Sequence, residues 1–156
     1  MSAILSTQNL VKKYGYKIVS NNISLTINKG DIYGFVGKNG AGKTTFMRQV
    51  LGLAFPDSGE ITLFGGEPLN TARKKIGSLI EFPSIYKNCT AYENMKRMAI
   101  LTGSSDKSVR KILDFVGLGN TGNKKAGQFS LGMRQRLGIA MALLGNPELL
   151  ILDEPI

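Results

Sequence analysis

The sequence predicts an α/β fold: a parallel sheet with flanking helices, preceded by an N-terminal antiparallel β subregion and interrupted by an inserted helical subregion. Three observations support this prediction. The glycine-rich residues 37–45 join an apolar run to a helix-like segment, the middle of the chain repeats apolar residues at helical spacing, and the apolar residues 149–152 end in two acidic residues. An unbroken apolar run is typical of a parallel strand covered on both faces.

The first third of the chain has a β pattern. Short segments rich in β-branched and apolar residues are separated by Asn, Lys and Gly. We expect strands at residues 4–10, 23–27 and 60–64, with turns at Asn21 and Asn22, at Lys29 and Gly30, and at Ser58 and Gly59.

Residues 37–45, GKNGAGKTT, fit the pattern G-x-x-x-x-G-K-[ST], and residues 32–36 are expected to form the strand that must precede it. Glycines let such a loop turn sharply and point several N–H groups at one anion. Lys43 can reach the outer phosphates, and Thr44 offers a hydroxyl to Mg²⁺. The pattern predicts a P-loop NTPase core that binds a nucleoside triphosphate. The residues expected to contact it are Gly37, Asn39, Gly40, Ala41, Gly42, Lys43, Thr44 and Thr45.

Helices are expected after this loop and through the middle of the chain. Thr90, followed three residues later by Glu93, is a capping box that starts a helix near Ala91. Gly52 and Gly117 are natural helix ends. The apolar stripes are Phe46, Met47, Val50 and Leu51; Val109, Ile112, Leu113 and Val116; and, in a helix that follows Ser130, Leu137, Ala140, Met141 and Leu144.

Asp153 and Glu154 supply the second half of the predicted site. At the C-terminal end of a buried strand, Asp153 can hold Mg²⁺ directly or through water, opposite Thr44. Glu154 can act as the general base for attack of water on the terminal phosphate, which favours hydrolysis over transfer. Two solvated carboxylates at a strand end are the alternative, and the presence of residues 37–45 disfavours it.

Length, composition and charge set wider bounds. The 156 residues, 42% of them hydrophobic, suffice for one domain with subregions. The single cysteine, Cys89, excludes a disulfide framework and favours a reducing compartment. We see no leader peptide or bilayer-spanning run, so a soluble cytoplasmic chain is expected. The net charge of +9 is spread over short basic groups, which favours a solvated surface that also attracts nucleotides. A nucleic-acid or membrane-surface partner is the alternative, and charge alone does not choose between them. No direct nucleic-acid contact is expected.

With both halves of the site in place, the chain resembles the nucleotide-binding domain of ABC transporter ATP-binding subunits, over the N-terminal two thirds of such a domain. By this resemblance residues 1–88 form the β subregion and P-loop core, residues 89–146 the helical subregion, and residues 147–156 the core strand. Tyr14 stands where the family places an aromatic ring that stacks on adenine. A half-buried core role is the alternative for Tyr14.

Residues 129–136, FSLGMRQR, resemble the family signature L-S-G-G-Q. By this resemblance Ser130 and Gly132 contact the terminal phosphate of ATP held by the opposite subunit, which implies a head-to-tail dimer of ATPase domains. Leu131 and Met133 depart from the signature, which weakens the expected contact. A plain helix cap is the alternative role for Ser130.

Residues 80–95 stand where the family has the glutamine loop that touches the membrane subunit, and Glu81 takes the place of the glutamine. A carboxylate there can bind Mg²⁺ or the attacking water, so the expected metal ligands are Thr44, Glu81 and Asp153 and the expected catalytic residues Lys43, Glu81 and Glu154. Two roles stay open for Phe82, Ile85 and Tyr86, namely an exposed docking patch and burial under the helical region.

The run Glu81-Phe82-Pro83, together with residues 129–136, is similar to the ATPases of exporters that serve bacitracin or lantibiotic resistance. The resemblance implies a subunit that binds ATP and Mg²⁺, hydrolyses ATP and powers a transmembrane permease at the inner face of the membrane, exporting a peptide antibiotic or a similar amphipathic compound.

Other functions are weighed against this one. An ABC-type ATPase acting on nucleic acid or ribosomes suits the positive charge, but such relatives usually carry coiled-coil insertions, zinc cysteines or tandem domains. A GTPase is disfavoured, because residues 123–126 lack a guanine-reading aspartate. The chain contains no histidine and closes at Pro155 and Ile156 without a turn or cap. We therefore expect a fold truncated at its C-terminus, with an open apolar sheet edge, that binds MgATP but hydrolyses it poorly.

Overall fold

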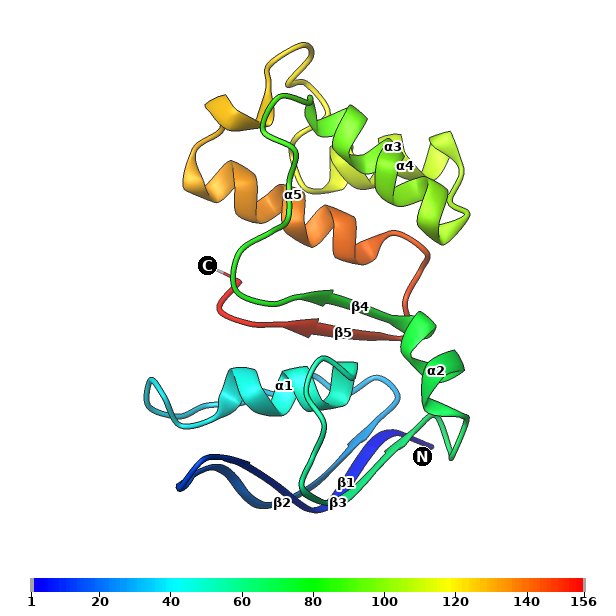
Figure 1. Cartoon of the computed structure of the whole chain (residues 1–156). Coiled ribbons are helices and arrows are strands. Elements are labelled where there is room, and N and C mark those ends of the chain that lie inside the picture. Colours follow the sequence, from blue (N-terminus) through cyan, green and yellow to red (C-terminus); the bar gives the residue numbers. More distant parts are fainter. Residues whose placement is uncertain (1, 156) are drawn as a thin grey trace. The chain divides into compact units, whose positions relative to one another are not determined.

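The computed structural model of the chain describes residues 2–155. It contains two compact units, which are divided between Ile76 and Gly77. Figure 1 shows helices and strands in both units, in agreement with the predicted α/β class.

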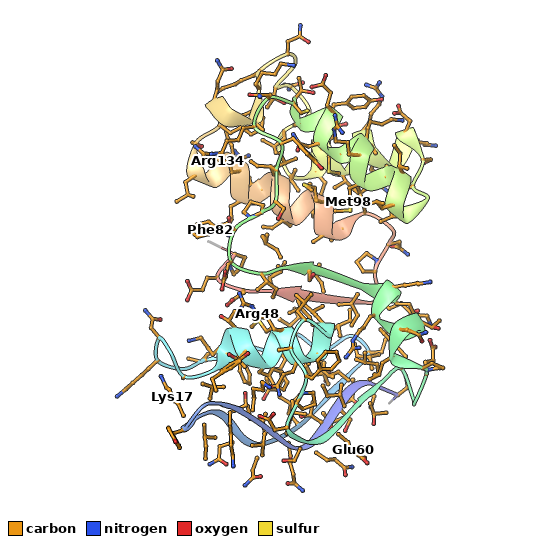
Figure 2. All side chains as sticks on the ribbon, in the orientation of Figure 1. Lys17, Arg48, Glu60, Phe82, Met98 and Arg134 are labelled. Carbon is orange, nitrogen blue, oxygen red and sulfur yellow. The ribbon has the colours of Figure 1, made fainter. Side chains whose placement is uncertain are left out.

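The first unit is built on an antiparallel sheet of three strands. The strands are β1 (Ala3–Tyr14), β2 (Lys17–Asn28) and β3 (Ser58–Leu63), and β1 lies in the middle, antiparallel to both neighbours. Strands β1 and β2 form one long hairpin with Gly15 in the left-handed conformation, and Lys17 lies at its tip (Figure 2). The predicted antiparallel β subregion is confirmed.

Two of the predicted turns were wrong. Asn21 and Asn22 lie inside β2, and Ser58 and Gly59 open β3, whereas Lys29 and Gly30 do form a turn. The β1–β2 register shifts at several points, and Asn22 has a φ of 49°. Because asparagine tolerates the left-handed conformation, a pair that reads as a turn can instead be absorbed by a bulge in a long strand.

Helix α1 (Lys43–Leu51) packs on this sheet. Val50 of the helix and Leu10 and Leu63 of the strands are fully buried. Gly52 ends the helix in the left-handed conformation with a φ of 76°, as predicted. Two short elements follow β3, the helix α2 (Leu69–Ala72) and the 3-10 turn η1 (Arg73–Lys75).

Residues 32–36, predicted to be a strand, have no strand assignment. Extended backbone becomes a strand only when a neighbouring strand pairs with it, and within the described residues the sheet of this unit consists of β1, β2 and β3. Ile32 and Val36 are accordingly almost fully exposed. Phe35 is the exception, because its ring stacks on Phe46 of α1 with centroids 5.0 Å apart. This contact holds the segment that leads into the loop.

The second unit contains a parallel pair of strands, β4 (Ile76–Leu79) and β5 (Leu149–Leu152) (Figure 1). The backbone N–H of Asp153 donates to the carbonyl of Leu79 at 2.8 Å, which continues the pairing beyond β5. The strand at residues 149–152 is confirmed, but Leu150 is 37% exposed and not covered on both faces. Strand β4 was not predicted, since its four residues IGSL include a glycine and a serine.

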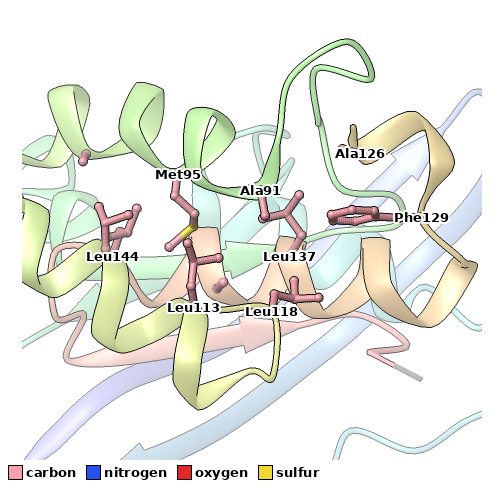
Figure 3. Close-up of a cluster of buried hydrophobic side chains, with 11 residues drawn as sticks. Ala91, Met95, Leu113, Leu118, Ala126, Phe129, Leu137 and Leu144 are labelled. Carbon is pink, nitrogen blue, oxygen red and sulfur yellow. The ribbon is translucent and has the colours of Figure 1, made fainter. Parts of the chain in front are cut away.

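Helices α3 (Ala91–Thr102), α4 (Asp106–Phe115) and α5 (Leu131–Leu143), with the 3-10 turn η2 (Ala126–Gln128), form the rest of this unit. Their apolar faces meet in one cluster, in which Met95, Leu118 and Leu137 are almost completely buried (Figure 3). The capping box of Thr90 and Glu93 is present, so the predicted start of α3 is confirmed. Among residues 2–155, no helix is both long and apolar enough to cross a membrane.

Candidate nucleotide-binding site

The loop before α1 is shaped by two glycines in the left-handed conformation. Gly40 has a φ of 78° and Gly42 a φ of 89°. At Gly42 a side chain is excluded as well, because a Cβ atom there would lie 1.8 Å from the carbonyl oxygen of Val19 in β2. The start of α1 therefore lies directly against the β2 backbone, and only glycine permits this approach.

Lys43 stabilises the loop with two hydrogen bonds. Its ammonium donates to the carbonyl of Gly37 at 2.7 Å and to that of Lys38 at 3.0 Å. These two bonds close residues 37–43 into a ring that includes the Lys43 side chain. An ammonium in this position provides the positive charge that a phosphate requires.

The N-terminus of α1 suits an anion. Gly42 caps the helix without a side-chain hydrogen bond, and the first turn contains no acidic residue. The positive end of the helix dipole is therefore not neutralised by an aspartate or glutamate of that turn. Together with the close approach at Gly42 and the Lys43 ammonium, this arrangement fits a bound polyphosphate.

Tyr14 lies at the end of β1 and its side chain is 53% exposed, so it is not a core residue. Asp57 holds this end of the strand: its carboxylate accepts from the Lys13 N–H at 2.6 Å and from the Lys12 ammonium at 3.3 Å. The Lys13 N–H is the main reason why the pKa of Asp57 lies below its ordinary value. The Lys12 ammonium also lies over the Tyr14 ring, 5.3 Å from its centroid. Tyr14 is thus an accessible ring on a fixed strand end.

In the second unit, three carboxylates follow the paired strands β4 and β5. Asp153, directly after β5, is buried, whereas Glu154 and Glu81 are exposed. Glu81 has a φ of 61° and Glu154 a φ of 45°, conformations that cost residues with a side chain roughly 1–3 kcal/mol. The Glu154 carbonyl accepts from the Gln135 amide of α5 at 3.1 Å. Strained backbone of this kind concentrates at functional sites.

Ser130 is the N-cap of α5, and its hydroxyl accepts from the N–H of Met133 at 3.2 Å. Ser130, Leu131 and Gly132 are all exposed. The first turn of α5 contains no acidic residue. The helix-cap role considered for Ser130 is therefore observed, and the exposed helix start remains accessible to a ligand.

Loop residues 82–86 divide between the two roles left open for them. Phe82, which projects from the loop after β4 (Figure 2), is 79% exposed, and Tyr86 is 59% exposed. Ile85 packs against the helical core instead. The exposed docking patch is thus reduced to Phe82 and Tyr86.

The predicted site residues fall into two groups, one in each unit. The first unit contains the loop and, at the end of β1, Tyr14. The second places Glu81, Asp153 and Glu154 after two neighbouring strands, and Ser130 and Gly132 at the start of α5. Within residues 2–155, no cluster of three or more Asp, Glu, Cys or His side chains is arranged to hold a metal. The metal set Thr44, Glu81 and Asp153 therefore stays a prediction.

Two contributors were missed by sequence reasoning. Asp57 was not singled out because it bonds to the Lys13 backbone, 44 residues away in sequence, and no local pattern announces such a bond. Val19 was missed because it contributes through its backbone carbonyl, against which Gly42 packs, and not through its side chain. The glycine at position 42 was the one available signal, since it indicated close backbone approach without naming the partner.

A glycine-rich loop closed by a lysine, in a chain that also carries an acidic pair after a parallel strand, defines a P-loop NTPase. A sequence profile described as ABC transporter matches residues 20–156, and the chain belongs to this family. The resemblance found in the sequence is confirmed.

Two curated relatives are close in sequence. The chain is 51% identical over 160 residues to the bacitracin transport ATP-binding protein BcrA of Enterococcus faecalis, covering 100% of this chain and 52% of that protein. It is 47% identical over 152 residues to the lantibiotic transport ATP-binding protein SrtF of Streptococcus pyogenes, covering 97% of this chain and 66% of that protein. The chain thus spans about half the length of the first relative.

Solved structures agree with the fold. An ATP-binding subunit of an ABC transporter matches with a TM-score of 0.85 and 28% identity, over 98% of this chain and 67% of that one. The ATP-binding cassette MJ0796, a dimer in a post-hydrolysis state bound to ADP and Pi, matches with a TM-score of 0.82 and 26% identity, over 97% of this chain and 74% of that one.

Proposed function

We propose that this chain is the ATP-binding part of an ATPase subunit that powers a membrane exporter, with a peptide antibiotic or a similar amphipathic compound as cargo. The observation that carries the proposal is the loop closed by Lys43, in a chain that is 51% identical over its whole length to a bacitracin transport ATP-binding protein. The loop supports ATP binding, and the relatives support the kind of cargo.

ATP is held by residues with separate tasks. The loop amides and Lys43 bind the phosphates, and the exposed Tyr14 ring stacks on adenine. Thr44, Glu81 and Asp153 are the proposed ligands of Mg²⁺. Hydroxyl and carboxylate oxygens are the donors that this hard cation prefers. Bound Mg²⁺ supplies neutralisation and orientation of the phosphates.

Hydrolysis is assigned to Glu154. Its carboxylate takes a proton from water as the water oxygen bonds to the terminal phosphorus. The bond from that phosphorus to the bridging oxygen breaks and ADP leaves, while Lys43 stabilises the charge that develops on the phosphate oxygens. The strained backbone at Glu154, fixed through its carbonyl by Gln135, supports a dedicated role for this residue.

The working unit is proposed to be a dimer of such ATPase domains bound to a transmembrane permease at the inner face of the membrane. In this dimer Ser130 and Gly132 of one copy contact the terminal phosphate of ATP on the other copy. ATP closes the dimer and hydrolysis reopens it, so that the cycle can drive movement of the permease. Phe82 and Tyr86 offer the permease an exposed apolar contact.

MgATP binding to the 156-residue chain tests the first part of the proposal. We expect saturable binding by calorimetry, lowered about tenfold or more by Lys43→Ala, since the substitution removes charge-assisted bonds to the phosphates. Lys38→Ala is the control, because only the backbone carbonyl of Lys38 takes part in the loop. Equal affinity in the chain and in Lys43→Ala would contradict the proposal.

Turnover tests the second part. Glu154→Gln should abolish ATP hydrolysis by the full transporter subunit while MgATP binding persists, because the amide is similar in shape and cannot accept the proton. ATP hydrolysis that persists in Glu154→Gln would contradict the role assigned to Glu154.

A second function, action on nucleic acid or ribosomes, is favoured by the net charge of +9 alone. It predicts binding to duplex DNA or rRNA that weakens steeply with salt. We expect no such binding above that of an unrelated protein with equal charge.

A further inference from the structure

Asn94, in the first turns of α3, is 1% exposed and bonds to three residues of the loop before the helix. Its amide oxygen accepts from the N–H of Tyr86 at 2.8 Å. Its amide nitrogen donates to the carbonyls of Thr90, Tyr86 and Cys89 at 2.8, 3.1 and 3.4 Å. Asparagine is the shortest side chain that offers an acceptor and a paired donor together. It therefore folds loop residues 86–90 against α3.

The same loop is bonded on its other side to the segment before α5. The carbonyl of Lys87 accepts from the N–H of Gly127, and that of Cys89 from the N–H of Ala126, both at 2.8 Å. Thr90 and Lys125 form an antiparallel bridge. Backbone hydrogen bonds to loop residues 86–90 therefore fix the position of residues 125–127.

Glu93, the neighbour of Asn94, reinforces this pairing. Its carboxylate accepts from the N–H of Thr90 at 2.6 Å and from the Lys125 ammonium at 3.4 Å. Both charged side chains are half exposed, so the ion pair adds little energy by itself. The buried amide of Asn94 is the stronger constraint, because a buried polar group that loses its partner is costly.

The connection from this pairing to the start of α5 is short and conformationally restricted. Gly127 belongs to the 3-10 turn η2, and the buried Phe129 follows it, its carbonyl accepting from Arg134 of α5 at 3.1 Å. Ser130 comes next and caps the helix. The position of residues 125–127 thus fixes where Ser130 and the first amides of α5 lie.

We propose that Asn94 is a positioning residue for the Ser130 end of α5: through loop residues 86–90 it sets the place of residues 125–127, and thereby the helix start that contacts the terminal phosphate. The inference rests on the proposed role of Ser130 and Gly132 in the second copy. In this proposal Asn94 acts only through the two backbone segments.

A purely structural role makes a different prediction. If Asn94 only stabilised the helical unit, its removal would resemble any core truncation of equal cost. Val109→Ala provides that comparison, because Val109 is fully buried in α4 and has no part in the loop pairing. Asn88→Ala provides the chemical control, because the same amide is removed from an exposed position of the same loop.

Amide hydrogen exchange on the full 156-residue chain is the first measurement. Asn94→Ala and Val109→Ala are compared under conditions that give them the same free energy of global unfolding. We then expect exchange at Ala126, Gly127 and Met133 to be about tenfold or more faster in Asn94→Ala than in Val109→Ala. Asn88→Ala should leave these amides unchanged. Equal acceleration in Asn94→Ala and Val109→Ala would overturn the proposal.

ATP-dependent self-association of the same chain is the second measurement. MgATP binding by the chain's own loop should be unchanged in Asn94→Ala, whereas association driven by MgATP should weaken about tenfold. A parent chain that binds no MgATP would refute the proposed function, and the exchange measurement would then decide the structural inference alone. Normal association in Asn94→Ala would refute the inference and leave the proposed function standing.

Gly127→Ala tests the same connection without touching α3, and it serves if Asn94→Ala does not fold. A Cβ atom at position 127 would lie 3.1 Å from the Lys87 carbonyl and 3.3 Å from its Cβ, so residues 125–127 must shift away from the loop. We expect faster exchange at Met133 with protection in α4 retained. Unchanged exchange at Met133 in this variant would also contradict the proposal.

Discussion

Ser20 of β2 donates its hydroxyl to the amide oxygen of Gln49 of α1 at 3.2 Å, and both side chains are almost completely buried. The amide nitrogen of Gln49 is the one buried side-chain polar atom without a hydrogen-bond partner in the described part of the chain. A buried amide that is only half satisfied costs stability. The helix after the nucleotide loop is thus tied to the sheet by a pair that is not at its energetic optimum.

Substitutions of Ser20 and Gln49 should show that the Gln49 amide is stabilised at its oxygen and destabilising at its nitrogen. Ser20→Ala removes the partner of the Gln49 oxygen and should lower the free energy of unfolding by about 1–3 kcal/mol. The double variant Ser20→Ala/Gln49→Met replaces both polar groups by apolar ones and should regain most of this loss. Urea unfolding measures both effects. A double variant that is less stable than Ser20→Ala would show that the amide contributes more than it costs.

Gly42→Ala should disrupt the loop. The left-handed conformation alone costs alanine about 1–2 kcal/mol, and the added Cβ would collide with the Val19 carbonyl. We expect lower stability and MgATP affinity reduced more than tenfold, both measurable on one sample by calorimetry. Gly34→Ala is the control, because Gly34 has no positive φ and a Cβ atom there would meet no other atom within 4 Å. Normal ATP binding by Gly42→Ala would mean that the nucleotide does not use this loop.

Tyr14 should contribute stacking energy without selecting the base. Tyr14→Ala should weaken ATP and GTP binding alike, by about 1–3 kcal/mol, whereas Tyr14→Phe keeps the ring and should change little. Competition of ATP and GTP for a fluorescent nucleotide measures both. Tyr16→Ala is the matched control, because Tyr16 is fully exposed on the neighbouring turn. A loss confined to ATP would indicate hydrogen bonding to the base instead.

Asp106 gives the helical unit a pH-dependent contribution. Hydrogen bonds from Tyr92, Lys96 and Arg110, with Tyr92 the largest cause, lower the pKa of its carboxyl from 3.8 to about 2. A lowered pKa stabilises the folded state above the unfolded pKa, and this stabilisation is lost as pH falls from near 4 through about 2. The melting temperature of the chain should therefore exceed that of Asp106→Asn at pH 6, and the two should converge toward pH 2. A difference that is independent of pH would contradict this account.

Local patterns were read correctly where a few neighbouring residues decide the outcome. Thr90 with Glu93 makes a capping box wherever it occurs before a helix, and the glycines of residues 37–45 announce a tight loop. Patterns failed where the outcome depends on a distant partner. Residues 32–36 look like a strand, but a strand exists only when another strand pairs with it.

The same reason hides the residues that support the site. Asp57 and Asn94 bond to backbone groups. Because nearly all residues carry the same backbone groups, the sequence does not mark which of them will be the partner. Asn94 could have been read as an ordinary helical residue, since only the course of loop residues 86–90 makes its amide important. Residues that contact a ligand can be recognised from local sequence motifs, whereas the residues that position them are recognised only from the folded structure.

Our central proposal is that the Lys43 loop binds a nucleotide and that Asp153 binds the metal of that nucleotide. A crystal structure of the chain with Mg²⁺ and a non-hydrolysable ATP analogue tests it most directly. We predict that the backbone amides of residues 37–45 and the Lys43 ammonium bind the triphosphate, with Mg²⁺ bound by the Thr44 hydroxyl and by Asp153 directly or through one water. A nucleotide bound away from this loop, or a metal that Asp153 does not approach, would contradict the claim.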